Sequence, residues 1–484
     1  MDKDLLSIQE ARQLAEAAYQ AQQIWGHASQ SEVDRVCAVM AEAAYLASAR
    51  LGQMASEETG YGIPEHKKLK NEFGSRIVWE SIKDCPTVGV VRHDPQKRIY
   101  EIAWPVGVIA ALTPSTNPTS TAMYKVISAV KARNAIVVAP HPSAVQCTLE
   151  TCRIMQRAAE QAGAPPNLVS CLQTISLPGT QELLHHKRVR LILATGGSAM
   201  VKAAHSVGKP AFGVGPGNVP VYVDRSADLK KAAQYIVSSK AFDCSTICAT
   251  EQAVVADQPI ALELERLMVA EGAYFADEVQ TDKLRKLLFH PDGSINTKAV
   301  GKSAQTVAQL AGINIPSTAR VIVTRLSLTG EKEPLSREKL TTVLGWYVED
   351  GWEAGCERSI ELITFGGRGH TQIIHAQDEA VIMAFGLEKP VFRILVNTMG
   401  TLGAVGITTG LMPSMTLGAG GEGGSITGDN ISVHHLYNIK RLAFEIQSPP
   451  AAAFSAPSAP AGSSNSQDLE TLVRKIVQDI IQSQ

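Results

Sequence analysis

The fold of this chain is decided by residues 106–139, which read VGVIAALTPSTNPTSTAMYKVISAVKARNAIVVA. Both ends of the stretch, 106–112 and 135–139, are short apolar runs of the kind that forms buried strands. Between them, residues 120–132 repeat apolar side chains at helical spacing. A strand, a helix and a second strand in this order predict a βαβ unit, whose two strands run parallel.

The same alternation continues downstream of this unit. Helices are predicted over 144–162, 181–185 and 198–205, and strands over 169–172, 191–194 and 219–223. Alternating strands and helices predict a parallel sheet covered by helices, and therefore a nucleotide-binding type of domain. The fold class that this pattern predicts is α/β.

The regions on either side carry other patterns. The first part of the chain is predicted to be helical, because apolar residues recur through 8–18 and again through 33–44. Residues 87–104 predict a β-hairpin. A second α/β stretch runs to about Leu417, and residues 433–447 predict a strand pair or a strand with a short helix.

Composition excludes several classes of protein. The 484 residues are 45% hydrophobic and 19% charged, with a formal net charge of -2, which describes a globular protein of two or more domains without a nucleic-acid bias. We find no uninterrupted apolar run of about 18 residues, and residues 1–10 lack the basic and apolar regions of a signal peptide. We therefore expect a soluble, cytosolic protein.

The cysteines give no sign of a metal site or a disulfide scaffold. They are sparse for the length and contain no Cys-x-x-Cys pair. We expect reduced thiols and no bound metal. The eight are Cys37, Cys85, Cys147, Cys152, Cys171, Cys244, Cys248 and Cys356.

Cys248 stands apart from the other cysteines. It lies in the segment 240–252, KAFDCSTICATEQ, among small residues just before a predicted strand over 251–256. A thiol at the mouth of a strand has the access that a nucleophile needs, so we expect covalent chemistry there.

Two glycine-rich segments are candidates for phosphate binding. Thr195-Gly196-Gly197-Ser198 lies between a predicted strand and helix, where free backbone N–H groups favour an anion. The segment 213–218, GVGPGN, suits a backbone that passes close to a ligand or another chain. Neither matches G-x-G-x-x-G, and each taken alone is more often a tight turn.

The end of the chain has a different composition. Residues 448–465 are rich in Ala, Pro and Ser, which predicts a disordered or extended linker. Residues 468–484 carry apolar side chains at helical spacing, which predicts a short amphipathic helix. This helix either docks on its own domain or binds a separate partner, and a long tether favours the partner.

Taken together, seven motifs in the same chain order resemble the CoA-acylating aldehyde dehydrogenases over about residues 5–447. The motifs are Pro114–Thr121, Ala139–Pro142, Ala194–Gly197, Gly213–Asn218, the Cys248 segment, Gly369–Thr371 and Pro413–Gly418. The resemblance implies an aldehyde dehydrogenase-like fold, with a Rossmann-like cofactor domain, an α/β catalytic domain and a small β oligomerisation element.

The domain boundaries that we expect follow this plan. The cofactor-binding domain takes residues 1–86 and 105–235, the catalytic domain 236–430, and the oligomerisation element 87–104 and 431–447. A flexible linker follows over 448–466 and an amphipathic helix over 467–484.

The resemblance also assigns catalytic roles. Cys248 is the nucleophile, and the Asn117 amide with the Cys248 backbone N–H stabilises the oxyanion. His370 is a candidate acid or base for the CoA step. Each role has an alternative. Asn117 could serve only as a turn residue before Pro118, and His370 could serve only to hold its own loop by hydrogen bonding. Cys244, where many relatives have Asn, is expected to be structural rather than a redox partner of Cys248.

The cofactor implied is NAD, with NADP not excluded, and coenzyme A is the co-substrate. Glu338 resembles the glutamate that holds the nicotinamide ribose, although Thr341-Thr342 stands where relatives usually have Pro nearby. His141 is expected on the adenosine side. The full set of expected cofactor-binding residues is Thr113, His141, Thr195, Gly196, Gly197, Ser198, Gly213 and Glu338.

The implied reaction oxidises a short-chain aldehyde to acyl-CoA through a thioester on Cys248. Hydrolytic relatives activate water with a Glu where this chain has Gly213-Val214-Gly215-Pro216, so a thiol acceptor is expected to complete turnover. Acetaldehyde is the preferred substrate and propionaldehyde the next. The alternatives are a hydrolytic aldehyde dehydrogenase that gives the free acid, and a non-catalytic microcompartment scaffold.

The tail resembles the encapsulation peptides of bacterial microcompartments, which are amphipathic helices on Ala/Pro/Ser-rich linkers. This resemblance implies that residues 467–484 bind shell or cargo proteins, and that the enzyme lies inside a microcompartment in the bacterial cytoplasm. A homodimer or homotetramer is expected, with no nucleic-acid or membrane partner.

Overall fold

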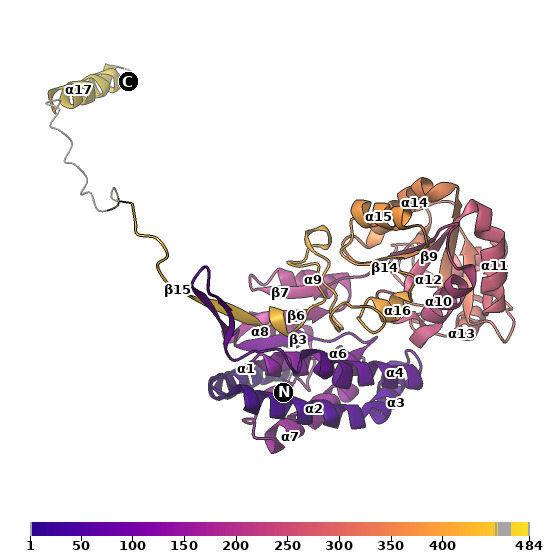
Figure 1. Cartoon of the computed structure of the whole chain (residues 1–484), viewed down its shortest axis with the longest axis horizontal. Coiled ribbons are helices and arrows are strands. Elements are labelled where there is room, and N and C mark those ends of the chain that lie inside the picture. Colours follow the sequence, from indigo (N-terminus) through magenta and orange to yellow (C-terminus); the bar gives the residue numbers. More distant parts are fainter. Residues whose placement is uncertain (1, 451–452, 454–465, 483–484) are drawn as a thin grey trace. The chain divides into compact units, whose positions relative to one another are not determined.

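The structure is a computed structural model that describes residues 2–450, 453 and 466–482. The chain divides into two compact units. The larger comprises Met1–Val91 and Ile102–Lys440, and the smaller comprises Arg92–Glu101 and Arg441–Gln484. Both large sheets belong to the larger unit (Figure 1). The residues that line the cavity described below also belong to this unit.

The first large sheet has five parallel strands in the order β5-β4-β3-β6-β7. This is the doubly wound order, in which the chain reverses direction across the sheet between β3 and β6. The strands are β3 (Val108–Leu112), β4 (Ala135–Ala139), β5 (Val169–Cys171), β6 (Val189–Thr195) and β7 (Ala211–Val214). Their helices are α6 (Pro118–Lys131), α7 (Val145–Gln161), α8 (Leu177–His185) and α9 (Ser198–His205).

The second large sheet has seven parallel strands in the order β10-β11-β12-β9-β8-β13-β14. They are β8 (Val219–Val223), β9 (Glu251–Asp257), β10 (Ala273–Ala276), β11 (Val321–Arg325), β12 (Val343–Glu349), β13 (Gln372–His375) and β14 (Ile394–Val396). The helices are α10 (Leu229–Ala241), α11 (Ala261–Ala270), α12 (Glu278–Leu288), α13 (Ala304–Ala311), α14 (Gly351–Gly366), α15 (Glu379–Glu388) and α16 (Gly400–Gly403).

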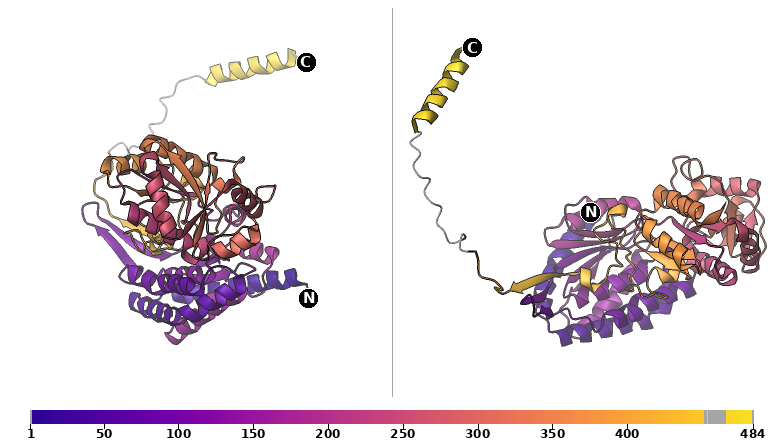
Figure 2. Two further views of the ribbon diagram at one scale, coloured as in Figure 1. Left: turned by 90° about the vertical axis from the view of Figure 1, so that its right-hand side faces the viewer. Right: turned by 45° about the horizontal axis from the view of Figure 1, so that its top comes forward.

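The N-terminal helices pack beside the first sheet, in indigo in Figures 1 and 2. Ala11, Ala15 and Ala18 lie on one face of the first helix and are fully buried, because small side chains let the helix approach its neighbours closely. The helices are α1 (Lys3–Trp25), α2 (Gln30–Leu46), α3 (Ser48–Thr59), α4 (Pro64–Glu72) and α5 (Val78–Ile82), with a π-helical turn over Phe73–Ile77.

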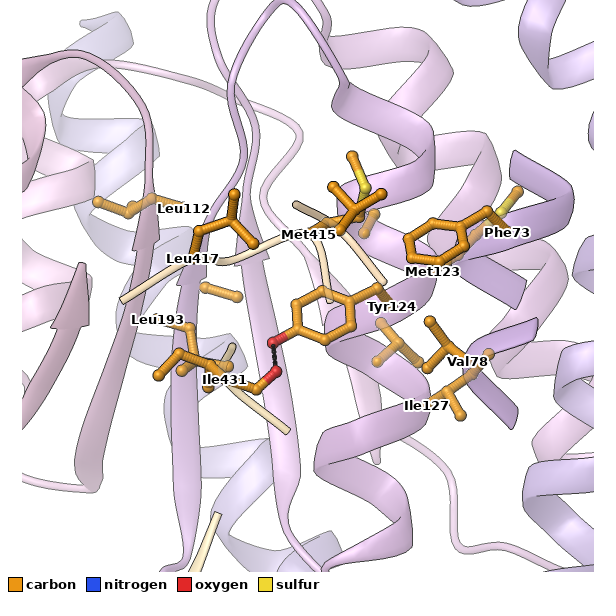
Figure 3. Close-up of a cluster of buried hydrophobic side chains, with 14 of the residues drawn as sticks. Phe73, Val78, Leu112, Met123, Tyr124, Ile127, Leu193, Met415, Leu417 and Ile431 are labelled. Atoms are coloured by element: carbon orange, nitrogen blue, oxygen red, sulfur yellow. Dashed lines mark hydrogen bonds between the residues drawn. The ribbon is translucent and has the colours of Figure 1, made fainter. Parts of the chain in front are cut away.

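Helix α6 lies at the centre of the larger unit. Tyr124, on α6, is fully buried, and its hydroxyl donates to the carbonyl of Ile431, while Phe73 and Met415 lie nearby (Figure 3). Burying a large apolar side chain contributes about 1.5–3 kcal/mol. The next residue, Lys125, donates to Leu112 O at 2.7 Å and Leu193 O at 2.9 Å, and so caps the ends of β3 and β6 where the sheet reverses direction.

The remaining elements are a small sheet and a terminal helix. Strands β1 (Gly89–Asp94), β2 (Ile99–Pro105) and β15 (Tyr437–Ala443) form a sheet with β2 in the middle. A 3-10 turn over Val433–His435 precedes β15, so the expected strand with a short helix is confirmed. Helix α17 spans Ser466–Gln482 and confirms the predicted terminal helix, whereas most of the predicted linker lies outside the described residues.

The sequence-based fold class is confirmed, with two corrections in detail. Strand β7 was not predicted, because Gly213 near its end was interpreted as part of a turn. Strand β8 was expected in the cofactor-binding domain but pairs with β9 and β13 of the second sheet. The change from one sheet to the other therefore falls between Val214 and Val219, before the expected boundary at residue 235, because the glycine-rich segment between them carries the chain across.

Two structural features are absent from the described residues. No helix among them is long and apolar enough to cross a membrane. Nor do they contain a group of three or more His, Cys, Asp or Glu side chains arranged to hold a metal ion.

Candidate active site

A cavity of about 690 Å³ opens between the two large sheets. From the first sheet it is lined by the segments that follow β3, β4 and β6, which is where doubly wound folds bind ligands. From the second sheet it is lined by segments that precede β9 and β12. The expected site residues on its wall are Asn117, His141, Thr195, Gly196, Gly197, Cys248 and Glu338.

The loop before Cys248 has an unusual backbone. Within the short segment Phe242–Ser245, the residues Asp243, Cys244 and Ser245 all have positive φ, at 45°, 54° and 66°, and Asp243 and Cys244 depart from helical geometry. Non-glycine residues in this region cost about 1–3 kcal/mol each, so surrounding contacts must hold them. The loop is fully enclosed apart from Cys248, which is partly exposed to the cavity, as a nucleophile requires.

The Cys248 thiol is protonated in the ligand-free protein at neutral pH. Burial raises the pKa of Cys248 to about 12, and the Glu338 carboxylate adds to the rise, while the Arg393 cation and the backbone N–H groups of Cys248 and Ala249 oppose it. Cys244 is buried, and burial raises its pKa to about 11, which agrees with a structural role. All eight cysteines are free.

Asn117 faces this loop from the start of α6. It occupies the N-cap position but does not cap the helix with its side chain, which leaves the amide free for other contacts. Its Nδ2 donates to Thr246 O at 2.9 Å and to Thr116 Oγ1 at 3.1 Å. The amide donor and the nucleophile loop therefore lie on the same part of the cavity wall.

A cluster of buried charges, which we call the Lys–Asp cluster, lies behind this loop. It consists of Lys67 and Lys70 from α4 and Asp243. Burial lowers the pKa of Lys70, against the opposing effect of Asp243. Burial acts to raise the pKa of Asp243, but the two ammonium groups hold it below its usual value. The Asp243 carboxylate is therefore stabilised in its charged form by the two lysines, although it is buried.

Gly217 lies in tight contact with three other parts of the site, which are those that carry Cys248, His370 and Glu338. A Cβ at this position would be 2.4 Å from Cys248 O and 2.9 Å from the His370 ring, so only glycine fits. Its N–H donates to Glu338 Oε1 at 2.9 Å. Burial raises the pKa of Glu338 to about 7. A titratable carboxylate therefore stands on the cavity wall close to Cys248.

His370 lies behind Gly217, off the cavity wall. It is buried, its Nδ1 contacts Thr371 Oγ1 at 2.9 Å, and its Nε2 has no hydrogen-bond partner among the described residues. Burial lowers the pKa of His370 to about 3, with help from the Arg393 cation. Arg393 donates to His370 O at 2.7 Å. The imidazole is therefore neutral at physiological pH.

The glycine-rich turn after β6 has room for a ligand. A Cβ at Gly197 would meet nothing within 4 Å, and this residue precedes α9, whose first N–H groups face the turn. Such a helix start favours an anion such as a pyrophosphate. Gly215 is equally open and lies on the cavity wall.

Two of the expected cofactor-binding residues, Thr113 and Gly213, do not line the cavity. Thr113 is fully buried, and no hydrogen-bond partner for its hydroxyl is found in the part of the chain that the structure describes. Gly213 packs β7 against α9, where a Cβ would be 2.8 Å from both Val201 and His205. Ser198 is the first residue of α9.

Sequence reasoning missed Lys67, Lys70, Asp243, Gly217 and Arg393. Helix α4 carries both lysines, and so polar a segment indicates a solvent-facing helix rather than a buried one. Gly217 lies in the glycine-rich segment 213–218, so the sequence offered a signal for this residue.

A model of the aldehyde dehydrogenase family matches residues 5–275. The chain is 36% identical to succinate-semialdehyde dehydrogenase (acetylating) of Clostridium kluyveri over 434 residues, which cover 90% of this chain and 95% of the relative. It is 40% identical to aldehyde-alcohol dehydrogenase 2 of Entamoeba histolytica, covering 86% of this chain and 49% of that protein. The chain thus spans about half the length of the aldehyde-alcohol dehydrogenases that it matches.

Solved structures share the fold at high similarity. An acetylating aldehyde dehydrogenase of Geobacillus thermoglucosidasius is 49% identical, with a TM-score of 0.92 over 93% of this chain and 99% of that one. Two propionaldehyde dehydrogenases, each 28% identical with a TM-score of 0.82, cover 90% of this chain and 97% of their own. One belongs to the fucose utilisation microcompartment of Clostridium phytofermentans, and the other, from Rhodopseudomonas palustris, has bound CoA and an acylated cysteine. On these matches, the chain belongs to the aldehyde dehydrogenase family.

Proposed function

We propose that the chain is a CoA-acylating aldehyde dehydrogenase, which oxidises a short-chain aldehyde to an acyl-CoA through a thioester on Cys248. The observation that carries this proposal is the pairing of Cys248, on the cavity wall, with the Asn117 amide bonded to the same loop. Acetylating relatives at 36% and 49% identity support it.

The first step is attack by Cys248 on the aldehyde. The Cys248 Sγ forms a bond to the carbonyl carbon, and the π electrons move to the oxygen, which becomes an alkoxide. The donors for this oxygen are the Cys248 backbone N–H and the Asn117 Nδ2, which exchanges one of its two hydrogen bonds, to Thr116 Oγ1 or Thr246 O, for one to the oxyanion. Because the thiol pKa is about 12, the thiol carries its proton before the reaction, and this proton passes to solvent as the carbon–sulfur bond forms.

The cavity fits a dinucleotide on the side of the first sheet. The open turn at Gly196 and Gly197 and the start of α9 would take the pyrophosphate, His141 and Thr195 would lie toward the adenosine half, and Glu338 toward the nicotinamide ribose. When bound, NAD supplies the two-electron oxidation that converts the alkoxide adduct to the thioester. NAD is the proposed cofactor, and NADP stays open.

The second half of the reaction transfers the acyl group to coenzyme A. The CoA thiolate attacks the thioester carbon, the bond to Cys248 Sγ breaks, and the Cys248 thiolate is released. A base must take the CoA thiol proton. His370 was the candidate from sequence, but Glu338 lines the cavity and has a pKa of about 7, whereas the buried His370 has a pKa of about 3. We therefore propose Glu338 as the acceptor and His370 as the second candidate.

A second candidate function is hydrolysis of the thioester to the free acid. The segment 213–217 offers no carboxylate, which favours CoA as the acceptor. Glu338 is the group that favours hydrolysis, since a carboxylate of raised pKa beside Cys248 can also activate water. A short apolar aldehyde fits the cavity, because Ile247, Val405 and Met415 give it an apolar wall. Within this class acetaldehyde is the proposed substrate and propionaldehyde the next.

The tail supports a location in a bacterial microcompartment. Leu469, Leu472, Val473 and Ile476 of α17 are exposed and lie on one face of the helix. One structurally similar propionaldehyde dehydrogenase comes from a microcompartment. We propose that α17 binds shell or cargo proteins. The alternative is that binding through α17 is the only function of the chain, which would make it a non-catalytic scaffold of the microcompartment.

The domain plan forms part of the same proposal. The region of the first sheet would bind the cofactor, the region of the second sheet would carry the nucleophile, and the small sheet of β1, β2 and β15 would join copies of the chain into a homodimer or homotetramer.

The test is NADH formation from acetaldehyde, followed by absorbance, with and without coenzyme A. We expect turnover that depends on CoA and is abolished by Cys248→Ala. Turnover without CoA would favour the hydrolytic function. Turnover in neither condition, with propionaldehyde also inactive, would favour the scaffold.

A further inference from the structure

Lys70 connects the buried charges to the expected oxyanion donor. Its Nζ donates to three acceptors, which are Asp243 Oδ2, Asn117 Oδ1 and, at 3.1 Å, Thr246 Oγ1. An ammonium group has three N–H donors and no acceptor. All three donors are therefore used, and the group that faces Lys70 on each partner must be an oxygen.

This contact decides the orientation of the Asn117 amide. A free Asn side chain can exchange its oxygen and its NH2 by rotation, and both orientations have the same shape. With the NH2 facing Lys70, donors would face donors inside a buried site. The contact therefore selects the orientation in which Oδ1 faces Lys70 and Nδ2 faces the cysteine loop, where it donates to Thr246 O at 2.9 Å.

The same ammonium also holds the cysteine loop. Asp243 and Thr246 both belong to this loop, and Thr246 Oγ1 donates to Asp243 Oδ2 at 2.6 Å. The backbone N–H of Ile63 donates to Asp243 Oδ1 at 2.7 Å, so the carboxylate is fixed on both sides. Lys70 thus ties the segment before α6 and the strained loop before Cys248 to one point.

We propose that Lys70 is a positioning residue for the reaction: it orients the Asn117 amide toward the Cys248 loop and sets the spacing between the oxyanion donor and the nucleophile. This inference rests on the proposed function, because it needs Asn117 to act on an oxyanion. Lys70 itself does not line the cavity and acts through Asn117.

Lys67 is a matched control from the same helix. Its Nζ lies 3.2 Å from the same Asp243 oxygen, and its side chain is similarly buried. Its other contact is the carbonyl of Thr116, at 3.0 Å, and not the Asn117 side chain. Since two lysines share one carboxylate, removal of either leaves a neutral ion pair, so Lys70→Met and Lys67→Met are expected to fold.

The test measures acylation of the thiol without an aldehyde, a nicotinamide cofactor or CoA. The full chain is mixed with p-nitrophenyl acetate, and the burst of p-nitrophenolate is followed by absorbance. Cys248 Sγ forms a bond to the ester carbonyl carbon, an oxyanion forms and collapses, the bond to the phenolate oxygen breaks, and the thiol proton goes to solvent. This reaction needs the oxyanion donor, but it needs neither oxidation of an aldehyde nor transfer of the acyl group to CoA.

A double-mutant cycle then separates positioning from stability. We expect Asn117→Ala to lower the burst rate by about 100- to 1000-fold and Lys70→Met by about 10- to 100-fold. The double variant should be no slower than Asn117→Ala alone. Lys67, the Ile63 N–H and the Thr246 hydroxyl still hold Asp243 when Lys70 is removed, so the amide is the contact through which Lys70 affects the reaction. Lys67→Met should keep a rate close to that of the wild type. Thermal melts check that each variant is folded.

Each outcome decides the question. A Lys70→Met rate equal to that of Lys67→Met, or a Lys70→Met loss that persists in the Asn117→Ala background, would overturn the inference and leave the proposed function intact. No burst in the wild type would overturn both. If Lys70→Met does not fold, Lys70→Gln replaces it in the cycle, with an amide N–H that restores one donor to Asn117 Oδ1 and a smaller expected loss.

Discussion

At the scale of single residues, the site depends on close contacts that leave no spare volume. Gly217 separates the Cys248 carbonyl from the His370 ring, and its N–H holds Glu338. A methyl group at position 217 would have to displace the Cys248 carbonyl, the His370 ring or the backbone of residue 217 itself, which holds Glu338. The geometry of the nucleophile, the carboxylate and the histidine is therefore set in part by a residue without a side chain.

We expect Gly217→Ala to destabilise the protein by about 1–3 kcal/mol, the usual cost of overpacking a dense interior. It should also lower kcat/KM, since Cys248 or Glu338 must move. Gly215→Ala is the control, because a Cβ there meets nothing within 4 Å. Denaturant unfolding gives the stability change. Equal stability of the two variants would show that the Gly217 contacts relax without cost.

The high pKa of the thiol makes a second prediction. Only the thiolate reacts with iodoacetamide, so with a pKa of about 12 the alkylation rate of Cys248 should rise about tenfold per pH unit from pH 7 to 9. Peptide mass spectrometry separates Cys248 from the partly exposed Cys85. A plateau below pH 9 would contradict the burial of the thiol.

Glu338→Gln tests the cause of that shift. The carboxylate is second only to burial in raising the thiol pKa, so its removal should speed alkylation at pH 8 in the absence of ligands. The same variant should slow CoA-dependent turnover, if Glu338 takes the CoA proton. Faster alkylation with unchanged turnover would return the acid–base role to His370.

The sequence revealed part of this site. Cys248, Asn117 and Glu338 stand in recognisable motifs and line the cavity. Lys70 and Asp243 do not stand out, because their importance comes from burial, and burial of a charged side chain depends on packing between α4 and a loop more than a hundred residues away.

At the scale of elements, strands were predicted better than the connections between them. Residues 135–139 and 219–223 form strands with the predicted bounds, since continuous apolar runs have few other uses. The sheet to which β8 belongs could not be predicted, because strand pairing is a long-range property. The left-handed loop before Cys248 also gave no signal, as its residues are Asp, Cys and Ser rather than Gly.

That loop supports a prediction with opposite signs at two serines. Ser245 has φ 66°, and no partner for its buried hydroxyl exists among the residues described. Ser245→Gly relieves both costs, and we expect a gain of about 0.5–1 kcal/mol. Ser359→Gly, inside α14, removes a hydroxyl that donates to Gly355 O at 2.8 Å, and a loss of about 1 kcal/mol is expected. Thermal melts compare them, and a destabilised Ser245→Gly would mean that the loop is not strained.

At the scale of the whole molecule, catalysis and the proposed recruitment use separate parts of the chain. Every residue on the cavity wall belongs to the larger unit, whereas α17 belongs to the smaller one. The sequence already indicated this division, because the composition changes sharply at residue 448. A local change of composition is readable without tertiary information, which is why the tail helix was predicted while the Lys–Asp cluster was not.

The apolar face of α17 should therefore govern partner binding without affecting turnover. Leu472→Glu places a charge on the face formed with Leu469, Val473 and Ile476, and we expect it to abolish co-sedimentation with microcompartment shell proteins. Gln478→Glu adds the same charge at an exposed polar position of the same helix and should bind normally. Both variants should keep wild-type kcat/KM, because the cavity lies in the other unit. If Leu472→Glu still co-sediments, the apolar face does not bind the shell, and if it lowers kcat/KM instead, the helix acts on its own enzyme.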